Sequence, residues 1–146
     1  MWCYNINMKI QKYAFVTLRL SMGFIFLWAF LDKLLGLGFA TKSASAWING
    51  GSPTFGFLKY TVKGPYIEFF NSLAGQAWVD WVFMAGLLFV GLTLIFNKYL
   101  KWGAIVGSIM LALMYLALLL PENNPIIDDH IIYILVLVIL AIRDRE

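Results

Sequence analysis

The chain has very few of the residues that bind metals or form disulfides. Its 146 residues include one cysteine, Cys3, and one histidine, His130. A single cysteine excludes an intrachain disulfide, a CxxC redox pair and a cluster of thiolate ligands. A single histidine excludes haem ligation by two histidines of one subunit and a histidine-rich metal site. We therefore expect no metal site and no covalently bound cofactor, and any redox chemistry requires an organic carrier, a partner chain or the substrate itself.

Charged residues are also scarce. Only 13% of the residues are Asp, Glu, Lys or Arg, whereas 62% are hydrophobic and 17% are aromatic. This composition excludes a disordered chain and argues against a soluble globular protein. The formal net charge is +3, but the basic residues are scattered rather than clustered, so we expect no nucleic-acid partner.

Long apolar runs are what the chain has in abundance. They cover residues 13–35, 78–96, 102–120 and 126–142, with ionisable residues almost only at their ends. A helix of about twenty residues crosses a hydrocarbon core of about 30 Å. Because each run is apolar on all sides, a soluble chain of this length could not cover four such helices. The runs predict one all-α membrane domain over residues 1–146, built as an integral membrane four-helix bundle in a lipid membrane.

The first run predicts a membrane helix rather than a signal peptide, because it is long, carries Arg19 and lacks a small-residue cleavage site. Basic residues then predict the orientation, since they gather in the N-terminal segment, in the second connection and at the C-terminus. They are Lys9, Lys12, Arg19, Lys98, Lys101, Arg143 and Arg145. By the positive-inside rule, both termini face the cytoplasm of a prokaryotic cell, and residues 36–77 and 121–130 face outward.

The first outer segment, residues 36–77, is too long and too apolar for a simple linker. Ser43 predicts the cap of a short helix that ends near Asn49, and Pro65 predicts the first residue of a second helix. An apolar stripe with helical spacing follows, formed by Tyr66, Phe69, Phe70 and Leu73. We expect short amphipathic helices that lie in the outer interface as a cap over the bundle; an ordinary aromatic membrane anchor is the alternative.

The third run carries small residues at the spacing that lets helix backbones approach closely. They are Gly103, Ala104, Gly107, Ser108 and Ala112. The sequence leaves open whether this contact lies within the bundle or between subunits.

Ionisable residues form two layers in the predicted bundle. The inner layer is Arg19, which is either a cytoplasmic anchor or a cation that faces a polar pocket. The outer layer lies at the ends of three spans and consists of Asp32, Lys33, Asp80, Asp128, Asp129 and His130. We expect this layer to converge beneath the cap as a site.

Helix capping is the alternative for part of the outer layer. Asn124 and Pro125 are typical of a helix start, and Asp80 and Asp128 then complement a helix dipole. Capping does not explain Asp32, whose charge opposes the dipole at a helix C-terminus, so we expect a cationic partner for it.

One face of the first run combines cations and aromatic rings. Arg19 and Lys33 lie within about 40° of each other around the helix, with Phe26 and Phe30 between them. This stripe could hold a flat quinone ring, with His130 or Tyr133 as its hydrogen-bond partner. The alternative is that the aromatic residues belong to the core of the bundle.

Three blocks of the sequence together resemble the DoxX/DoxD family of membrane proteins. The first block is RLSMG (residues 19–23) with WAFLDKL (28–34), the second is SPTFGFL (52–58) and the third is NPIIDDHIIY (124–133). The resemblance implies a four-helix membrane bundle and, through DoxD, a membrane subunit of a thiosulfate:quinone oxidoreductase. Such an enzyme couples the oxidation of thiosulfate to tetrathionate with the reduction of quinone, and a second subunit accompanies DoxD.

The site residues follow from the outer layer and from this resemblance. We take Asp32, Asp129 and His130 as candidate catalytic residues, with Asp129 and His130 as proton donors to quinone. The candidate substrate-binding residues are Arg19, Lys33, Asp80, Asp128 and Tyr133. A competing hypothesis is a non-catalytic accessory subunit of a larger respiratory or oxidase complex, with other membrane subunits or further copies of the chain as partners. A small transporter is a weaker third hypothesis.

Overall fold

The protein is helical throughout the part that its structure, a computed structural model, describes: residues 2–119, 121, 124 and 126–143, with side chains from residue 8 on. The long helices are α1 (Trp2–Leu35), α3 (Ala77–Phe96), α4 (Leu100–Ala117) and α5 (Asp129–Arg143). Between α1 and α3 lie the 3-10 turns η1 (Ser43–Ser45) and η2 (Trp47–Asn49), the π-helix η3 (Phe57–Thr61) and the short helix α2 (Ile67–Leu73). No strand occurs among the described residues.

Three helical segments are long and apolar enough to cross a membrane: Met8–Leu35, Ala77–Phe96 and Leu100–Ala117. These segments confirm that the protein is helical and suited to a membrane, and they correspond to three of the four predicted runs. The third helix begins two residues before the predicted start, and the predicted end at residue 120 lies outside the described residues. The fourth run is shorter than predicted, because α5 begins at Asp129 and has 15 residues.

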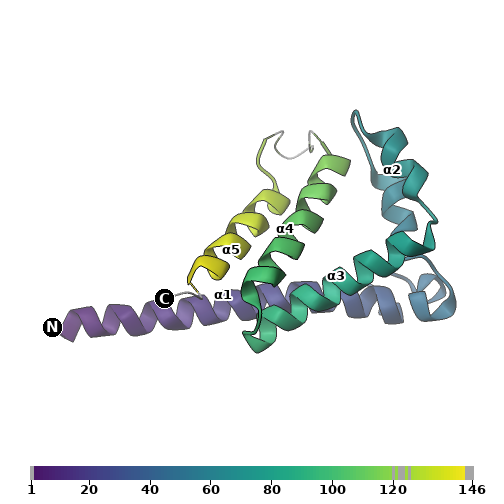
Figure 1. Cartoon of the computed structure of the whole chain (residues 1–146). Helices are drawn as coiled ribbons and strands as arrows, with labels where there is room; N and C mark the ends of the chain where they lie inside the picture. Colours follow the sequence, from purple (N-terminus) through teal and green to yellow (C-terminus); the bar gives the residue numbers. More distant parts are fainter. Residues whose placement is uncertain (1, 120, 122–123, 125, 144–146) are drawn as a thin grey trace.

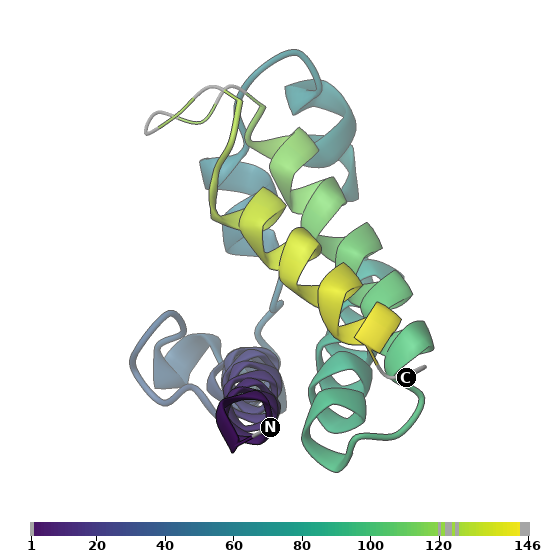
Figure 2. The same ribbon diagram turned by 90° about the vertical axis from the view of Figure 1, so that its left-hand side faces the viewer.

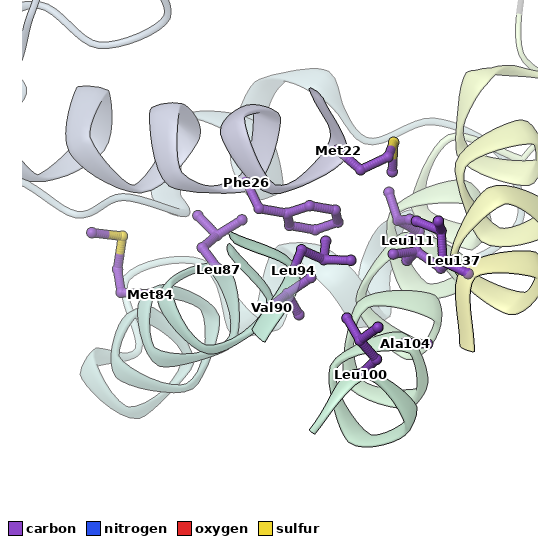
Figure 3. Packing of buried hydrophobic residues seen from close by; sticks show 11 residues of the cluster. Met22, Phe26, Met84, Leu87, Val90, Leu94, Leu100, Ala104, Leu111 and Leu137 are labelled. Atoms are coloured by element: carbon purple, nitrogen blue, oxygen red, sulfur yellow. The ribbon is translucent and has the colours of Figure 1, made fainter. Parts of the chain in front are cut away.

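The long helices form two antiparallel pairs, α1 with α3 and α4 with α5, and α3 packs on α4 to join the pairs (Figure 1). Figure 2 looks along α1 and shows α4 and α5 crossing above the first pair. The N-terminal part of α1 extends past the other helices (Figure 1). An apolar core fills the junction of the pairs (Figure 3). Its buried members include Met22, Phe26, Val90, Leu94, Leu111 and Leu137.

Glycines bring the helices close together within the chain. A methyl group on Gly103 of α4 would lie 2.0 Å from the Thr93 hydroxyl of α3, and one on Gly107 would lie 2.8 Å from Leu137 of α5. Both distances are shorter than the contacts that β-carbons make in proteins, so a side chain at either position would force its neighbour to move. The small-residue face of the third run therefore packs, at both glycines, against other helices of the same chain.

The connection between α1 and α3 folds back as a cap, residues 36–76, over the end where α1 finishes and α3 starts (Figure 1). The chain enters it through Gly36, whose φ of +68° is left-handed, and a side chain there would meet the backbone of Ser43 at 2.6 Å. The backbone N–H of Lys63 donates to the carbonyl of Ala117 at 2.9 Å, which ties the cap to the end of α4. Trp47 of the cap also meets Trp81 of α3 edge to face, with ring centroids 4.6 Å apart.

The local structure of the cap differs from the prediction. In place of one helix capped by Ser43, two separate 3-10 turns form, and Lys42 precedes the first without a side-chain cap. The second helix starts at Ile67, two residues after Pro65, with Tyr66 at its N-cap. Glycines and prolines divide this segment too often for a longer helix to propagate. Within the predicted stripe Phe70 is buried, whereas Tyr66 and Phe69 are exposed.

Candidate functional site

Lys33, in the last turn of α1, lies between two cavities beneath the cap. The first cavity, of about 200 Å³, is bounded by α3, α4 and the cap. Its walls are almost entirely apolar and include Phe57, Leu58, Phe70, Phe83, Met110 and Met114. The Lys33 ammonium lies 5.9 Å from the centroid of the Phe83 ring, a cation–π contact. Among the described residues that line this cavity, Lys33 alone is ionisable.

The second cavity, of about 670 Å³, lies within the cap and is much more polar. Lys33 borders it together with a second lysine and several hydroxyl groups, namely those of Thr41, Ser45, Ser52, Tyr60 and Thr61. The second lysine is Lys42. Pro53 and Phe57 line both cavities along with Lys33. One ammonium group can therefore act on an anion in the polar cavity and on a neutral ring in the apolar one.

Asp80, at the start of α3, holds the cap in place. Its carboxylate is 6% exposed and accepts three hydrogen bonds on one oxygen. The donors are the hydroxyl of Ser52 (2.9 Å), the backbone N–H of Thr54 (3.1 Å) and the hydroxyl of Thr54 (2.6 Å). Since Thr54 lines the apolar cavity, the hydrogen bonds from Thr54 to Asp80 fix the position of one wall of that cavity.

Asp32, at the end of α1, has a similar role. It is 2% exposed, and its carboxylate accepts the backbone N–H groups of Phe39 (3.2 Å) and Ala40 (3.0 Å). The loop after α1 supplies these two donors, and the neighbouring Lys33 interacts electrostatically with the carboxylate, as expected for a cationic partner. Asp32 and Lys33 also border a third cavity, of about 330 Å³, beside Trp28.

At the start of α5, Asp128 forms hydrogen bonds with residues of the first helical turn. Asp128 accepts the backbone N–H groups of His130 (3.1 Å) and Ile131 (3.3 Å), and its second oxygen lies 2.7 Å from Nδ1 of His130. This is N-capping geometry, so Asp128 and not Asn124 caps the helix. Asn124 makes an earlier turn by accepting the N–H groups of Ile126 and Ile127, and Pro125 lies outside the described residues. The Asp129 side chain is exposed.

The Asp128 cap makes the start of α5 sensitive to acid. Partial burial raises the pKa of this carboxyl, but its hydrogen bonds with His130 and Ile131 outweigh that effect and hold the pKa below its ordinary value. Asp128 precedes α5 and lies outside the three spans. Its stabilisation is present above the pKa of the unfolded state and is lost as the pH falls through the lowered folded pKa.

Two substitutions of Asp128 distinguish the contribution of the helix cap to stability from the contribution of the carboxylate charge. Asp128→Ala is expected to cost about 0.5–2 kcal/mol in the free energy of unfolding near neutral pH. Asp128→Asn retains a cap and is expected to keep most of that stability while losing its acid dependence. Unfolding of the protein in detergent micelles, followed between pH 3 and 7, measures both. An acid-induced loss that persists unchanged in Asp128→Asn would contradict the assignment.

The two remaining candidates have contacts within the helices. Arg19 donates from its guanidinium to the carbonyl of Leu94 and, at 3.0 Å, to that of Ile95, so it binds the C-terminal end of α3. The last carbonyls of a helix lack intrahelical partners and carry partial negative charge, which explains this contact. Tyr133 is half-buried and packs against the apolar core.

The structure thus divides the predicted site. Lys33 borders both cavities beneath the cap, and Asp80 holds Thr54 in the wall of the apolar one. Asp32 borders only the third cavity, beside Trp28. Asp128 and His130 bind each other at the start of α5, and Arg19 lies at the far end of α3. The sequence prediction missed Ser52, Thr54 and Met110. Hydroxyl groups on both sides of Pro53 were the available signal, because a buried acid needs such donors.

Among the residues that the structure describes, no group of three or more His, Cys, Asp or Glu side chains is arranged to hold a metal ion. Comparisons of the chain with models of protein families, with curated proteins and with solved structures found no match.

Proposed function

We propose that this chain is a DoxX/DoxD-like membrane subunit of a quinone-linked oxidoreductase that acts on small sulfur oxyanions such as thiosulfate. The observation that carries the proposal is the position of Lys33 between a hydroxyl-lined cavity and an apolar one. An oxyanion needs cations and hydrogen-bond donors, whereas a quinone ring needs a flat apolar pocket. The shared lining brings these two environments together.

The sizes of the cavities fit these occupants. The apolar cavity, at about 200 Å³, is smaller than the ~300–1,000 Å³ typical of pockets for larger ligands. It suits a single ring whose isoprenoid tail lies in the lipid. The polar cavity is larger and borders Lys33 and Lys42, whose charges attract a dianion.

The reaction balances without a metal in the chain. Two thiosulfate dianions join through a new S–S bond to give tetrathionate, and they release two electrons. One quinone takes up these two electrons and two protons from water to become quinol. The Lys33 ammonium stabilises the negative charge of the sulfur anions and the charge that develops on the quinone oxygen.

The proposal includes the membrane arrangement. The four long helices make one membrane domain in the cell membrane of a prokaryote, with both termini in the cytoplasm and the cap outside. The 15 residues of α5 are about 22 Å long, so α5 spans a locally thinned bilayer beside the 18-residue α4. A second subunit or further copies of the chain are the expected partners.

Replacing Lys33 tests this function. We expect Lys33→Met to lower thiosulfate-dependent reduction of a soluble quinone analogue at least about tenfold, because the side chain keeps its length and loses its charge. The measurement uses the native complex in purified membranes and follows quinol formation by absorbance. Lys59→Met is the matched control, because Lys59 is an exposed lysine of the same cap.

Two results would contradict the proposal. Equal activity of the Lys33→Met and Lys59→Met proteins would remove Lys33 from the site. Membranes in which thiosulfate reduces no quinone, while other respiratory subunits purify with the chain, would favour the accessory-subunit hypothesis instead.

A further inference from the structure

A separate cationic cavity lies at the opposite end of the helices from the cap. It has a volume of about 270 Å³ and is formed where α1 passes the turn between α3 and α4 and the end of α5. Its polar lining consists of Lys12, Arg19, Asn97 and Arg143. Three cations from two helices therefore face one small volume.

Contacts hold two of these cations without neutralising them. Arg19 is fixed by the carbonyls of Leu94 and Ile95 at the end of α3. The guanidinium carbon of Arg143 lies 4.0 Å from the centroid of the Phe15 ring, which stacks on it. In the described part of the chain, no carboxylate forms a salt bridge with Lys12, Arg19 or Arg143.

We propose that this cavity binds the phosphate head group of an anionic membrane lipid. Guanidinium groups form paired hydrogen bonds with phosphate oxygens, and basic pockets between membrane helices are suited to such head groups. The remaining walls are apolar, with Phe15, Val16, Leu100 and Leu140. These walls match the start of an acyl chain and would give a free phosphate ion nothing to bind.

The surroundings of the cavity agree with a lipid. On the membrane side of the cavity, α1 leaves Val16, Leu20 and Phe24 exposed along one face of the helix. An acyl chain that follows this helix from the cavity covers apolar surface which the protein leaves open.

Lipid titration of purified protein tests the proposal. The protein in zwitterionic detergent receives phosphatidylglycerol, phosphatidylcholine or inorganic phosphate at constant ionic strength, and thermal unfolding and native mass spectrometry follow binding. We expect phosphatidylglycerol alone to raise the unfolding temperature and to stay bound. Lys12→Gln is expected to weaken this binding roughly fivefold, and Lys12→Gln with Arg143→Gln roughly 25-fold.

The matched control removes the same charge at the same end. Lys98→Gln with Lys101→Gln changes two exposed lysines that do not line this cavity and is expected to leave the affinity unchanged. An equal loss in this control would overturn the site in favour of diffuse surface attraction. Stabilisation by inorganic phosphate to the same extent would overturn the lipid assignment, and so would equal binding of phosphatidylcholine. If the double variant does not fold, Lys12→Gln decides alone, because Lys12 is exposed.

Discussion

Asp80→Ala is expected to lower the free energy of unfolding by about 2–6 kcal/mol. The substitution leaves both the N–H and the hydroxyl of Thr54 without an acceptor in a buried place, and each unsatisfied donor costs about 1–3 kcal/mol. The hydroxyl of Ser52 adds less, because Ser52 is only half-buried and water can replace the carboxylate. The loss should be concentrated in the cap, since all three donors belong to it.

Hydrogen exchange and denaturant unfolding in detergent micelles measure this effect. The amide of Thr54 should lose its protection first in the Asp80→Ala protein. Thr54→Val removes one donor and keeps the side-chain shape, so it should cost a smaller amount, about 1–3 kcal/mol. Glu68→Ala, which removes an exposed acid of the same cap, should change stability by less than about 0.5 kcal/mol. An Asp80→Ala protein as stable as this control would show that Asp80 does not anchor the cap.

Gly103→Ala is expected to lower the free energy of unfolding by about 1–3 kcal/mol or more by forcing α3 and α4 apart. The new methyl group would lie 2.0 Å from the hydroxyl oxygen and 2.9 Å from the β-carbon of Thr93. Thr93 cannot rotate away at low cost, because its side chain is β-branched and its hydroxyl donates to the carbonyl of Val90 at 2.9 Å.

A glycine in open space provides the control. Gly56 has a φ of −59°, and no heavy atom lies within 4 Å of a methyl group built on it. Gly56→Ala should therefore be neutral or stabilising by up to about 1 kcal/mol. Combining Gly103→Ala with Thr93→Ala removes the closest overlap and should recover part of the loss, which a double-mutant cycle measures. Additive losses of the two single variants would contradict the contact.

Sequence patterns predicted the helices of this protein better than they predicted which residues contact one another. The apolar runs predicted the membrane helices because hydropathy is a property of consecutive residues. Bounds were less accurate: α1 begins far before residue 13, and α5 begins at Asp129 because Asp128, rather than Asn124, caps it. The apolar cap was expected. Its division into short turns was not, because it depends on several glycines and prolines acting together.

The candidate site was predicted only in part. Asp32 and Lys33 stood out because ionisable residues in an apolar run are costly. Lys33 borders the two cavities beneath the cap, whereas Asp32 borders only the third cavity, beside Trp28. The sequence assigned the N-cap to Asn124 and a dipole role to Asp128 and Asp80. In the structure Asp128 is itself the N-cap, and Asp80 binds Ser52 and Thr54. The sequence left open whether Arg19 is an anchor or a cation that faces a pocket; in the structure it lines the cationic cavity and also binds backbone carbonyls of α3.

The sequence by itself determined the class of this protein, because twenty consecutive apolar residues have few stable environments besides lipid. Only the tertiary structure decided which ionisable groups hold the fold together and which ones line cavities. Thr54 lies 26 residues from Asp80 in the chain, and Leu94 lies 75 residues from Arg19. A buried charge takes whatever donor or acceptor packing brings within about 3 Å, and that neighbour is a result of folding rather than of any local pattern.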